Sequence, residues 1–294
     1  MSAQATVRAQ AKVNLLLRVL ARETSGYHSI ETVFLRVELA DTVRVRISAG
    51  TSLDLSGPEL PRNGLGPTEQ NLAYRAAIAY QAASGWPHGF AIEIEKNIPV
   101  GGGLGGGSAD AGAVLRALDA LSPNPLGAQL VEIAAPLGAD VPFMTIESPM
   151  AVAWGRGERL LPIRVPDARP MLIVVPDFSV STAAAYGWIA SSRGENAPRG
   201  STLSLAALDT WEGIAGVATN DFERVVAAHH PQITELVDEL ASADAMVAMM
   251  SGSGSAVFGV FEASTDVAGF VRSTGCRSFP TSTATRVASV SIES

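Results

Sequence analysis

PVGGGLGGGS, residues 99–108, holds six glycines in ten residues, and an amphipathic helical pattern follows from Ala109 to Leu121. The segment before it, Phe90 to Ile94, alternates in the manner of a half-buried strand. The predicted unit is therefore a strand, a glycine loop and a helix that Ser108 caps at its N-terminus. Glycines let backbone N–H groups converge on one point, and a helix N-terminus adds about half a positive charge there. The stretch predicts an anion-binding site.

This loop differs from the two most familiar phosphate-binding loops. A Walker A loop ends in Gly-Lys-Ser/Thr, whereas Gly106-Gly107-Ser108 contains no lysine. A dinucleotide-binding fingerprint can be placed on Gly101, Gly103 and Gly106, but it requires an acidic residue after a second strand, and this chain continues as a helix. A flexible linker is disfavoured because each glycine costs roughly 0.5–1 kcal/mol in entropy beside a well-patterned helix.

Composition favours a cytoplasmic enzyme. The chain has 294 residues, enough for one large or two ordinary domains, and is 47% hydrophobic and 17% charged. We expect no membrane span, because no apolar run reaches about 18 residues. We also expect no secretion signal, because the first residues lack the apolar segment that a signal peptide contains. The net charge of −8 disfavours nucleic acid as a partner, and the single cysteine, Cys276, excludes an internal disulfide.

Two polar features outside the loop point to chemistry. Lys12 and Asn14 share one face of an otherwise apolar strand predicted over residues 7–17. Lys12 alone would fit a snorkelling residue at a sheet edge, but Asn14 beside it favours a polar cavity. Asp140 follows a helix that stops at Gly138, where its carboxylate meets the negative end of the helix dipole. Either a distant basic partner such as Lys12 or a structural turn would explain Asp140.

The order of elements predicts an α+β fold in two domains. Strands and helices mix without regular alternation, and three prolines between residues 162 and 170 indicate a boundary. We therefore expect one domain over residues 1–160, which carries the glycine loop, and a second over residues 161–294. Residues 191–204 are predicted to form a loop, and a second glycine motif over residues 251–255 precedes a strand.

Three polar motifs together resemble those of the GHMP kinase superfamily, which are small-molecule kinases with a non-Walker phosphate loop. The motifs span nearly the whole chain: Ala11-Lys12-Val13-Asn14, the glycine loop with its helix, and Ser251-Gly252-Ser253-Gly254. Three more segments narrow the resemblance to the kinases of a cytidine diphosphate-linked methylerythritol: Gly26-Tyr27-His28, Gly138-Ala139-Asp140-Val141-Pro142 and Asn220-Asp221-Phe222-Glu223. That family usually has proline in place of Gln10 and aspartate in place of Ser25.

The resemblance implies a two-domain GHMP kinase fold, with a mixed α/β N-terminal domain and an α/β C-terminal domain. It also implies ATP as phosphoryl donor, Mg²⁺, and phosphorylation of the acceptor's 2-hydroxyl in the non-mevalonate route to isoprenoid precursors. Asp140 is implied as general base, Lys12 as its charge partner and Asn14 as a residue that orients the acceptor. The implied ATP-binding residues are Pro99, Val100, Gly101, Gly102, Gly103, Leu104, Gly105, Gly106, Gly107 and Ser108, with Asn71, Leu72 and Lys96. The implied acceptor-binding residues are Tyr27, His28, Thr182 and Tyr186, and Ser108 is the implied protein ligand of Mg²⁺.

Three alternatives stay open. Another kinase of the superfamily would act on homoserine or mevalonate, and a decarboxylase of the same fold would act on a mevalonate diphosphate. The decarboxylase has no use for a cytosine-binding segment, so Gly26-Tyr27-His28 counts against it. A binding module without catalysis is disfavoured because Lys12 and Asp140 are both present. The sequence does not predict the oligomeric state.

Overall fold

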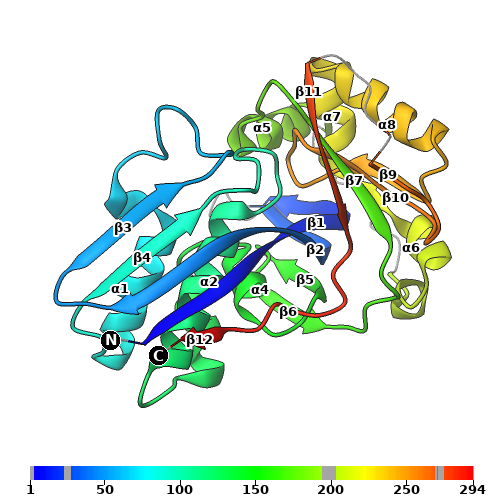
Figure 1. Cartoon of the computed structure of the whole chain (residues 1–294). Helices are drawn as coiled ribbons and strands as arrows, with labels where there is room; N and C mark the ends of the chain where they lie inside the picture. The colour runs from blue at the N-terminus through cyan, green and yellow to red at the C-terminus, as the bar shows by residue number, and fades with distance from the viewer. Residues whose placement is uncertain (1–2, 23–27, 194–202, 269, 271–274, 294) are drawn as a thin grey trace.

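Two β-sheets, one large and one small, form the body of the molecule together with helices packed on them (Figure 1). The structure is a computed structural model, and it describes residues 3–22, 28–193, 203–268, 270 and 275–293. The long strands β1 and β2 run through the middle of the molecule (Figure 1).

The larger sheet is built on an antiparallel hairpin of β1 (Gln4–Arg22) and β2 (His28–Ile47). Shifts in register between Gln10 and Lys12, and again between Asn14 and Leu16, interrupt the pairing on both sides of the segment that carries the predicted polar face. Six further strands complete this sheet: β3 (Thr51–Ser56), β4 (Phe90–Glu95), β5 (Met150–Gly155), β6 (Arg159–Pro162), β8 (Thr219–Asn220) and β12 (Ser291–Glu293).

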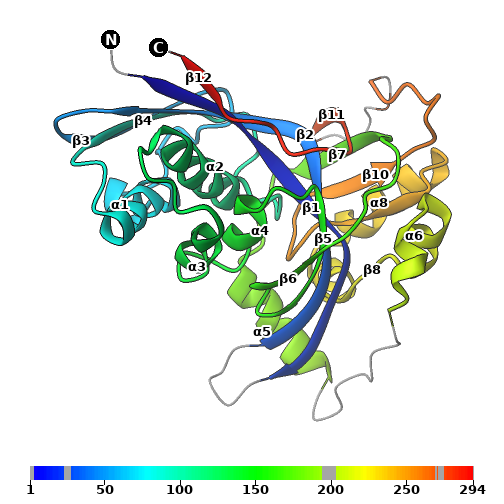
Figure 2. The same cartoon turned by 90° about the horizontal axis from the view of Figure 1, so that it is seen from below.

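Helices cover one face of the larger sheet (Figure 2). They are α1 (Leu72–Ser84), α2 (Gly106–Leu121), α3 (Leu130–Ala134) and α4 (Val141–Thr145), with the 3₁₀ turns η1 (Thr68–Gln70) and η2 (Gly127–Gln129). The apolar stripe of α2, which includes Val114, Leu115 and Leu118, is fully buried. On β2, the alternating residues Val43 and Val45 are fully buried as well. Burial of these apolar faces therefore holds the helices to the sheet.

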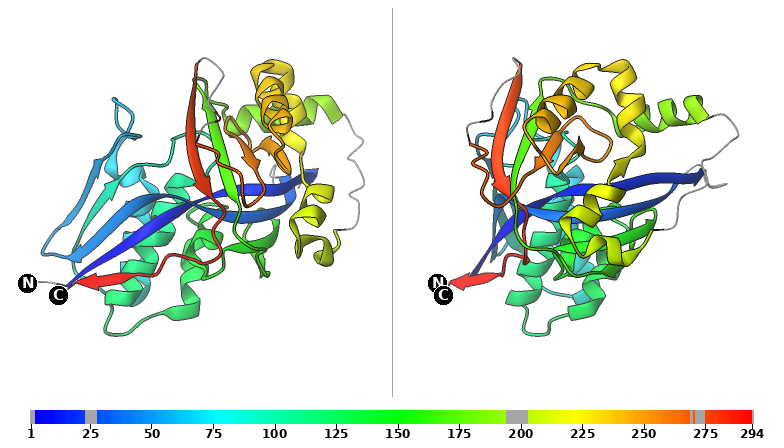
Figure 3. Two further views of the ribbon diagram at one scale, coloured as in Figure 1. Left: turned by 45° about the vertical axis from the view of Figure 1, so that its right-hand side comes forward. Right: turned by 90° about the vertical axis from the view of Figure 1, so that its right-hand side faces the viewer.

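The smaller sheet is antiparallel and has the strand order β11-β7-β10-β9. Its strands are β7 (Pro170–Pro176), β9 (Val247–Met250), β10 (Val257–Val260) and β11 (Cys276–Ser282). The helices α7 (Asp221–His229) and α8 (Gln232–Ser242) lie beside it (Figure 3). The remaining helical elements are α5 (Thr182–Arg193), η3 (Leu205–Leu208) and α6 (Trp211–Val217).

The predicted α+β class is confirmed, as is the strand over Phe90–Ile94 that leads to the glycine loop. The prediction that Ser108 caps the following helix is wrong. α2 begins at Gly106, and Gly105 is its N-cap with a left-handed φ of 71°. Glycine adopts this conformation at no steric cost, so any member of the glycine run suits it, and the sequence alone does not say which one takes it.

The second half of the chain returns to the first sheet. β8 pairs with β1 in parallel, and β12 pairs with it so that Gln4 lies opposite Glu293. The two ends of the chain are therefore neighbours (Figure 1). The domain boundary at residues 160–161 stays a prediction. Most of the loop predicted over 191–204 lies outside the described residues, and α5 extends into it as far as Arg193. Among the described helices, none combines the length and apolarity needed to cross a membrane.

Candidate active site

The glycine loop owes its shape to three left-handed residues. Gly101, Gly103 and Gly105 have φ values of 83°, 79° and 71°, which residues with a Cβ rarely adopt. A Cβ on Gly103 would also overlap the carbonyl oxygen of Ser251. α2 begins within this stretch, at Gly106, so its unpaired first N–H groups and its dipole favour an anion there.

The second glycine motif lies against the first. The hydroxyl of Ser251 donates a hydrogen bond to the carbonyl oxygen of Gly103 (3.1 Å). On the other side of this turn, the side-chain amide of Asn220 donates to the carbonyl oxygen of Gly252 (2.8 Å). Asn220 is buried at the start of α7, and it therefore anchors the turn to the second half of the chain.

Lys12 is a buried cation at the point where these segments meet. The residue is 3% exposed, and its ammonium donates to Asn14 Oδ1 (2.8 Å) and to the carbonyl oxygen of Gly103 (2.9 Å). A third oxygen, Oδ2 of Asp140, lies 3.4 Å from Lys12 Nζ. The structure therefore brings together the lysine of the first strand, the glycine loop and the carboxylate that the sequence singled out.

Asp140 occupies the N-cap position of α4, but its carboxylate does not cap the helix. An aspartate at this position usually accepts an N–H of the first turn. Here the carboxylate faces Lys12 instead, and its side chain is 30% exposed. It is therefore an ionic partner of Lys12 that solvent or a ligand can still reach.

Both the oxygen and the nitrogen of the Asn14 side-chain amide form hydrogen bonds within the protein. Its Oδ1 accepts from Lys12, and its Nδ2 donates to Thr32 Oγ1 (2.8 Å), which in turn donates to the carbonyl oxygen of Leu16 (2.6 Å). This chain of bonds fixes the orientation of the amide and aims Oδ1 at the ammonium. The structure therefore shows Asn14 as a support for Lys12, and a contact with an acceptor stays a prediction.

A cleft of about 270 Å³ opens in front of Lys12 and Asp140. Residues from both halves of the chain line it: Lys12, Asn14, Leu17, Ile30, Phe34, Gly103, Gly105, Ser108, Ala139, Asp140, Arg156, Thr182, Tyr186, Phe222, Gly252 and Ser253. The predicted residues Ser108, Thr182 and Tyr186 thus share one cavity with Lys12 and Asp140.

The predicted acceptor side of the cleft is formed by α5. Thr182 Oγ1 and Ser253 Oγ share a hydrogen bond of 2.9 Å, which joins α5 to the second glycine motif. The ring of Tyr186 packs edge-on against Phe222, with centroids 4.9 Å apart. Burial raises the pKa of Tyr186, and the negative charge of Asp140 raises it further. Tyr186 therefore presents a neutral phenol at neutral pH.

Sequence reasoning missed several residues of the cleft wall. Arg156 stands between Gly155 and Gly157, a setting that predicts only a turn. Phe34 lies in an apolar pattern that fits an ordinary core position, and Phe222 entered the resemblance only as part of the family segment Asn220-Asp221-Phe222-Glu223, with no role in the cleft. The glycines beside Arg156 are the one signal that could have pointed to an exposed functional side chain.

Lys96, predicted near adenine, is 1% exposed and pairs with two carboxylates, those of Asp41 and Asp110. Burial alone lowers the pKa of Lys96, but the two carboxylates outweigh burial and raise it. Oδ1 of Asp41 also accepts the backbone N–H groups of Asn97 and Ile98, at 2.5 and 2.7 Å. The cluster therefore fixes the start of the glycine segment, and a contact of Lys96 with ATP stays a prediction.

The other predicted binding residues either lie beside the glycine loop or have side chains that the structure does not describe. Asn71 caps α1 by accepting a backbone N–H of its first turn. A Cβ on Gly107 would lie 3.8 Å from Leu72 Cδ1, which places Leu72 next to the start of α2. Tyr27 lies outside the described residues, and only the backbone of His28, the first residue of β2, is described. The placement of the cytosine therefore stays a prediction.

Within the described residues, no group of three or more His, Cys, Asp and Glu side chains converges as metal ligands. The cleft does offer one carboxylate, that of Asp140, and the hydroxyls of Ser108, Thr182, Tyr186 and Ser253, of which only Ser108 belongs to the glycine loop. Such a sparse oxygen set suits Mg²⁺, which keeps most of its water and phosphate ligands when it arrives with a nucleotide. The residues present therefore fit a nucleotide-borne Mg²⁺ and do not form an all-protein metal site.

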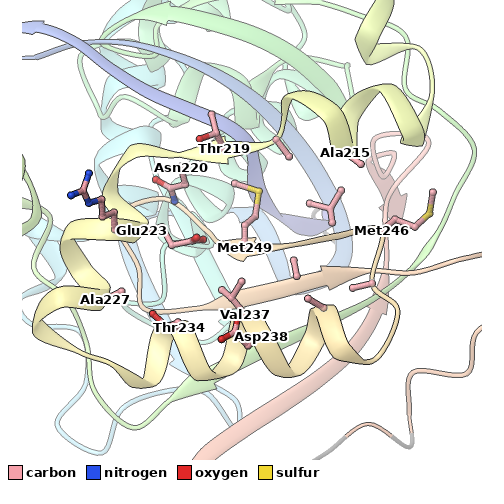
Figure 4. Close-up of a pocket in the computed structure, with 16 residues that line it drawn as sticks. Ala215, Thr219, Asn220, Glu223, Ala227, Thr234, Val237, Asp238, Met246 and Met249 are labelled. Carbon is pink, nitrogen blue, oxygen red and sulfur yellow. The ribbon is translucent and has the colours of Figure 1, made fainter. Parts of the chain in front are cut away.

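A second and larger cavity, of about 650 Å³, lies between α7, α8 and β9 (Figure 4). Alanines leave this space open, and Glu223 and Asp238 face it from opposite helices. This cavity shares no lining residue with the cleft of Lys12, and none of the predicted catalytic and binding residues lies in it. Size alone therefore does not identify the active site in this molecule.

Comparisons with known proteins show one family along most of the chain. A family model of the GHMP kinases N terminal domain matches residues 71–148, and one of the GHMP kinases C terminal matches residues 202–279. The 4-diphosphocytidyl-2-C-methyl-D-erythritol kinase of Desulfotalea psychrophila is 39% identical over 264 residues, which are 88% of this chain and 86% of that protein.

Solved structures agree with these matches. A crystal structure of 4-(cytidine 5'-diphospho)-2C-methyl-D-erythritol kinase is 35% identical, covers 95% of this chain and 98% of its own, and has a TM-score of 0.77. Homoserine kinase from Cytophaga hutchinsonii reaches a TM-score of 0.67 at 16% identity, covering 100% of this chain and 98% of its own. That second likeness shows a shared fold. The two-domain fold and the superfamily expected from the motifs are confirmed.

Proposed function

The chain belongs to the GHMP kinase family, and we propose that it phosphorylates the 2-hydroxyl of 4-diphosphocytidyl-2-C-methyl-D-erythritol, with ATP as the donor. This reaction is a step of the non-mevalonate route to isoprenoid precursors. The relatives that carry this enzyme's name support the choice of acceptor. The geometry that supports phosphoryl transfer is the meeting of Lys12, Asp140 and the glycine loop in one cleft.

ATP phosphates would lie along the glycine loop from Gly101 to Ser108. Left-handed glycines free the backbone N–H groups of the loop, and the N-terminus of α2 adds its dipole. Phosphoryl transfer needs little covalent chemistry from a protein, so positioning and charge stabilisation of this kind account for most of its catalysis. Asn71 and Leu72 stand beside the start of α2, where adenine would border the loop.

Asp140 would accept the proton of the acceptor hydroxyl, and Lys12 would hold that hydroxyl and offset the charge that develops. Asp140 can do so because its carboxylate neither caps α4 nor is fully buried. General-base assistance is worth roughly 10²–10⁴-fold in rate. Lys12 is held by Asn14 and Gly103, so its ammonium is already in place before the substrates arrive.

Mg²⁺ bound to ATP would neutralise phosphate charge, and Ser108 would be its protein ligand. The acceptor would enter from the side of α5, where Thr182 and Tyr186 line the cleft. Its cytosine would stack on Tyr27, with His28 bonded to the polar edge of the base. This assignment of the acceptor side rests on the resemblance of the Gly26-Tyr27-His28 segment to the family.

A panel assay tests the proposal. Purified protein is mixed with Mg-ATP and, in turn, the cytidylylated methylerythritol, mevalonate, homoserine and a mevalonate diphosphate. ADP release and CO₂ release are measured, and phosphorus NMR locates the new phosphate. We expect turnover on the cytidylylated compound alone, with the new phosphate on its 2-hydroxyl and no CO₂. Turnover on mevalonate or homoserine without turnover on the cytidylylated compound would refute the proposed acceptor.

A further inference from the structure

Two aromatic rings separate the Lys12 ammonium from a second buried cation. Lys12 Nζ lies 5.7 Å from the centroid of the Phe34 ring, and Phe34 stacks on Phe143 with centroids 4.9 Å apart. Cζ of Arg36 in turn lies 5.1 Å from the centroid of Phe143. The four side chains therefore form a stack of successive contacts, Lys12 to Phe34, Phe34 to Phe143 and Phe143 to Arg36, in which each cation lies over one ring, as the negative face of an aromatic ring favours.

Arg36 is 2% exposed, and within the described chain its guanidinium bonds only carbonyl oxygens. Those oxygens belong to Phe143 (2.8 Å), Ile146 (3.1 Å) and Ser148 (3.3 Å), at and just after the end of α4. The last carbonyls of a helix lack intrahelical partners, and a cation there also meets the negative end of the dipole. Arg36 therefore secures the C-terminal end of α4.

The opposite end of α4 begins at Asp140, so whatever holds the helix also places that carboxylate. The same arginine stands opposite Lys12 in the β1–β2 register, and Phe34 stands opposite Asn14. Three members of the stack, Lys12, Phe34 and Arg36, thus come from β1 and β2, and the fourth, Phe143, comes from the helix that begins after Asp140.

We propose that Arg36 is a positioning residue for phosphoryl transfer, which acts through Phe143 and α4 to fix the separation of Lys12 and Asp140. The inference rests on the roles proposed above for that pair. Arg36 itself lines neither cavity, so its effect reaches the reaction only through the helix. Burial, followed by the positive charge of Arg116, lowers the pKa of Arg36 to about 9, and the group keeps its charge at neutral pH.

Arg36→Lys keeps the charge but replaces a planar fork by a compact ammonium, which cannot reproduce the separate positions of the Nε and Nη2 donors. Misplacement of a catalytic group by about 1 Å can lower a rate by about 10²-fold. We therefore expect kcat to fall by about 10- to 100-fold, while KM for ATP changes by less than about twofold because the glycine loop is untouched.

Two further variants distinguish a positioning role from a general loss of stability. Phe143→Leu keeps an apolar core side chain but removes the ring from the stack, and we expect it to lower kcat in the same way. Arg116→Lys is the matched control, because Arg116 is also buried but bonds the carbonyl oxygen of Ala288. We expect a similar change in melting temperature and an unchanged kcat. If Arg36→Lys and Phe143→Leu leave kcat intact, or if Arg116→Lys lowers it equally, the positioning role is refuted.

A double-mutant cycle with Asp140→Asn separates this inference from the proposed function. If Arg36 acts through Asp140, Arg36→Lys changes the residual kcat of the Asp140→Asn enzyme by less than about twofold. If the double variant instead loses kcat by the product of the two single-variant factors, the positioning role is refuted and the role of Asp140 is left intact. If Asp140→Asn alone retains full kcat, the role of Asp140 fails, and the positioning inference fails with it.

Discussion

Two buried lysines touch the glycine loop, and they differ in what surrounds their charge. Lys12 is 3% exposed and packs against Gly105, and Lys96 is 1% exposed and lies under Gly106. Lys96 is paired with two buried carboxylates, whereas Lys12 has two neutral oxygens and the partly exposed carboxylate of Asp140. The two lysines are therefore buried to a similar extent but differ in the charges that surround them.

The difference shows how one residue type can serve two purposes at one loop. A cation enclosed by two carboxylates has its charge fully compensated, so it can hold structure but has little capacity left for a ligand. A cation that faces a cleft, with its one carboxylate accessible, can still bind a developing negative charge. The comparison assigns chemistry to Lys12 and anchoring of the loop to Lys96.

The largest effect is expected from Lys12→Met. Methionine fills similar space without a charge, so the variant should lower kcat by about 10²–10⁴-fold. The melting temperature should fall little, since Asp140 can turn to solvent once its partner is gone. Steady-state kinetics and a thermal melt measure both quantities. A large loss of melting temperature with kcat preserved would reverse the assignments of the two lysines.

Lys96→Met provides the opposite case. It leaves the carboxylates of Asp41 and Asp110 buried without a cation, a change that typically destabilises a protein by about 3–5 kcal/mol. Chemical denaturation measures this loss, and activity should fall chiefly because less protein is folded. The double variant Lys96→Met with Asp110→Asn is the control, because removing one carboxylate charge should restore part of the stability. Full stability in Lys96→Met would show that the cluster does not anchor the loop.

The sequence predicted the strand and the glycine loop from local causes and marked Lys12 and Asp140 as residues that need an explanation, while the pairing of these two was implied by the family resemblance. Glycine runs specify unusual backbone, and a lysine in an apolar strand or a carboxylate past a helix end needs a partner. The partners of Lys96 were not predictable in this way. Asp41 stands 55 residues from Lys96 along the chain, and only the folded sheet brings the two together.

The same limit applies to the stack behind Lys12. Phe34 and Phe143 fit ordinary core positions in the sequence, and Arg36 lies in a strand whose pairing partner is set by tertiary structure. The start of α2 was misplaced for a different reason, since several consecutive glycines are equally able to take the left-handed N-cap position. Local chemistry is therefore readable from sequence, whereas pairing over long distances is readable only where a family resemblance supplies it, as for Lys12 and Asp140.

Gly103→Ala tests whether the loop that both lysines touch needs its backbone shape. The new Cβ would overlap the Ser251 carbonyl oxygen, and the φ of 79° would be strained. We expect KM for ATP to rise by about tenfold or more, because strain of roughly 1–3 kcal/mol displaces the loop. Gly216→Ala is the control: this glycine lies inside α6 with no heavy atom near its Cβ position, so alanine should stabilise the protein slightly. An unchanged KM for ATP in Gly103→Ala would argue against phosphate binding at this loop.

The smallest effect concerns Glu223, a half-buried carboxylate that, within the described residues, forms no ion pair of the kind that Lys12 and Lys96 form. Its Oε2 accepts the N–H of Met250 (2.7 Å), but burial outweighs this bond and raises the pKa of Glu223 above its ordinary value of 4.5. The unfolded chain therefore releases this proton at lower pH than the folded chain, so stability falls as pH rises from about 4.5 through the raised pKa. Glu223→Gln keeps an acceptor for Met250 and removes the charge. We expect Glu223→Gln to raise the melting temperature by a few degrees at pH 7 and to leave it unchanged at pH 4. Asp238→Asn is the control, because Asp238 is exposed on the wall of the same cavity (Figure 4), and it should change the melting temperature at neither pH. A loss at pH 7 would mean that the hydrogen bond to Met250 outweighs burial, and an equal gain at both pH values would mean that the charge of Glu223 is not the cause of the effect.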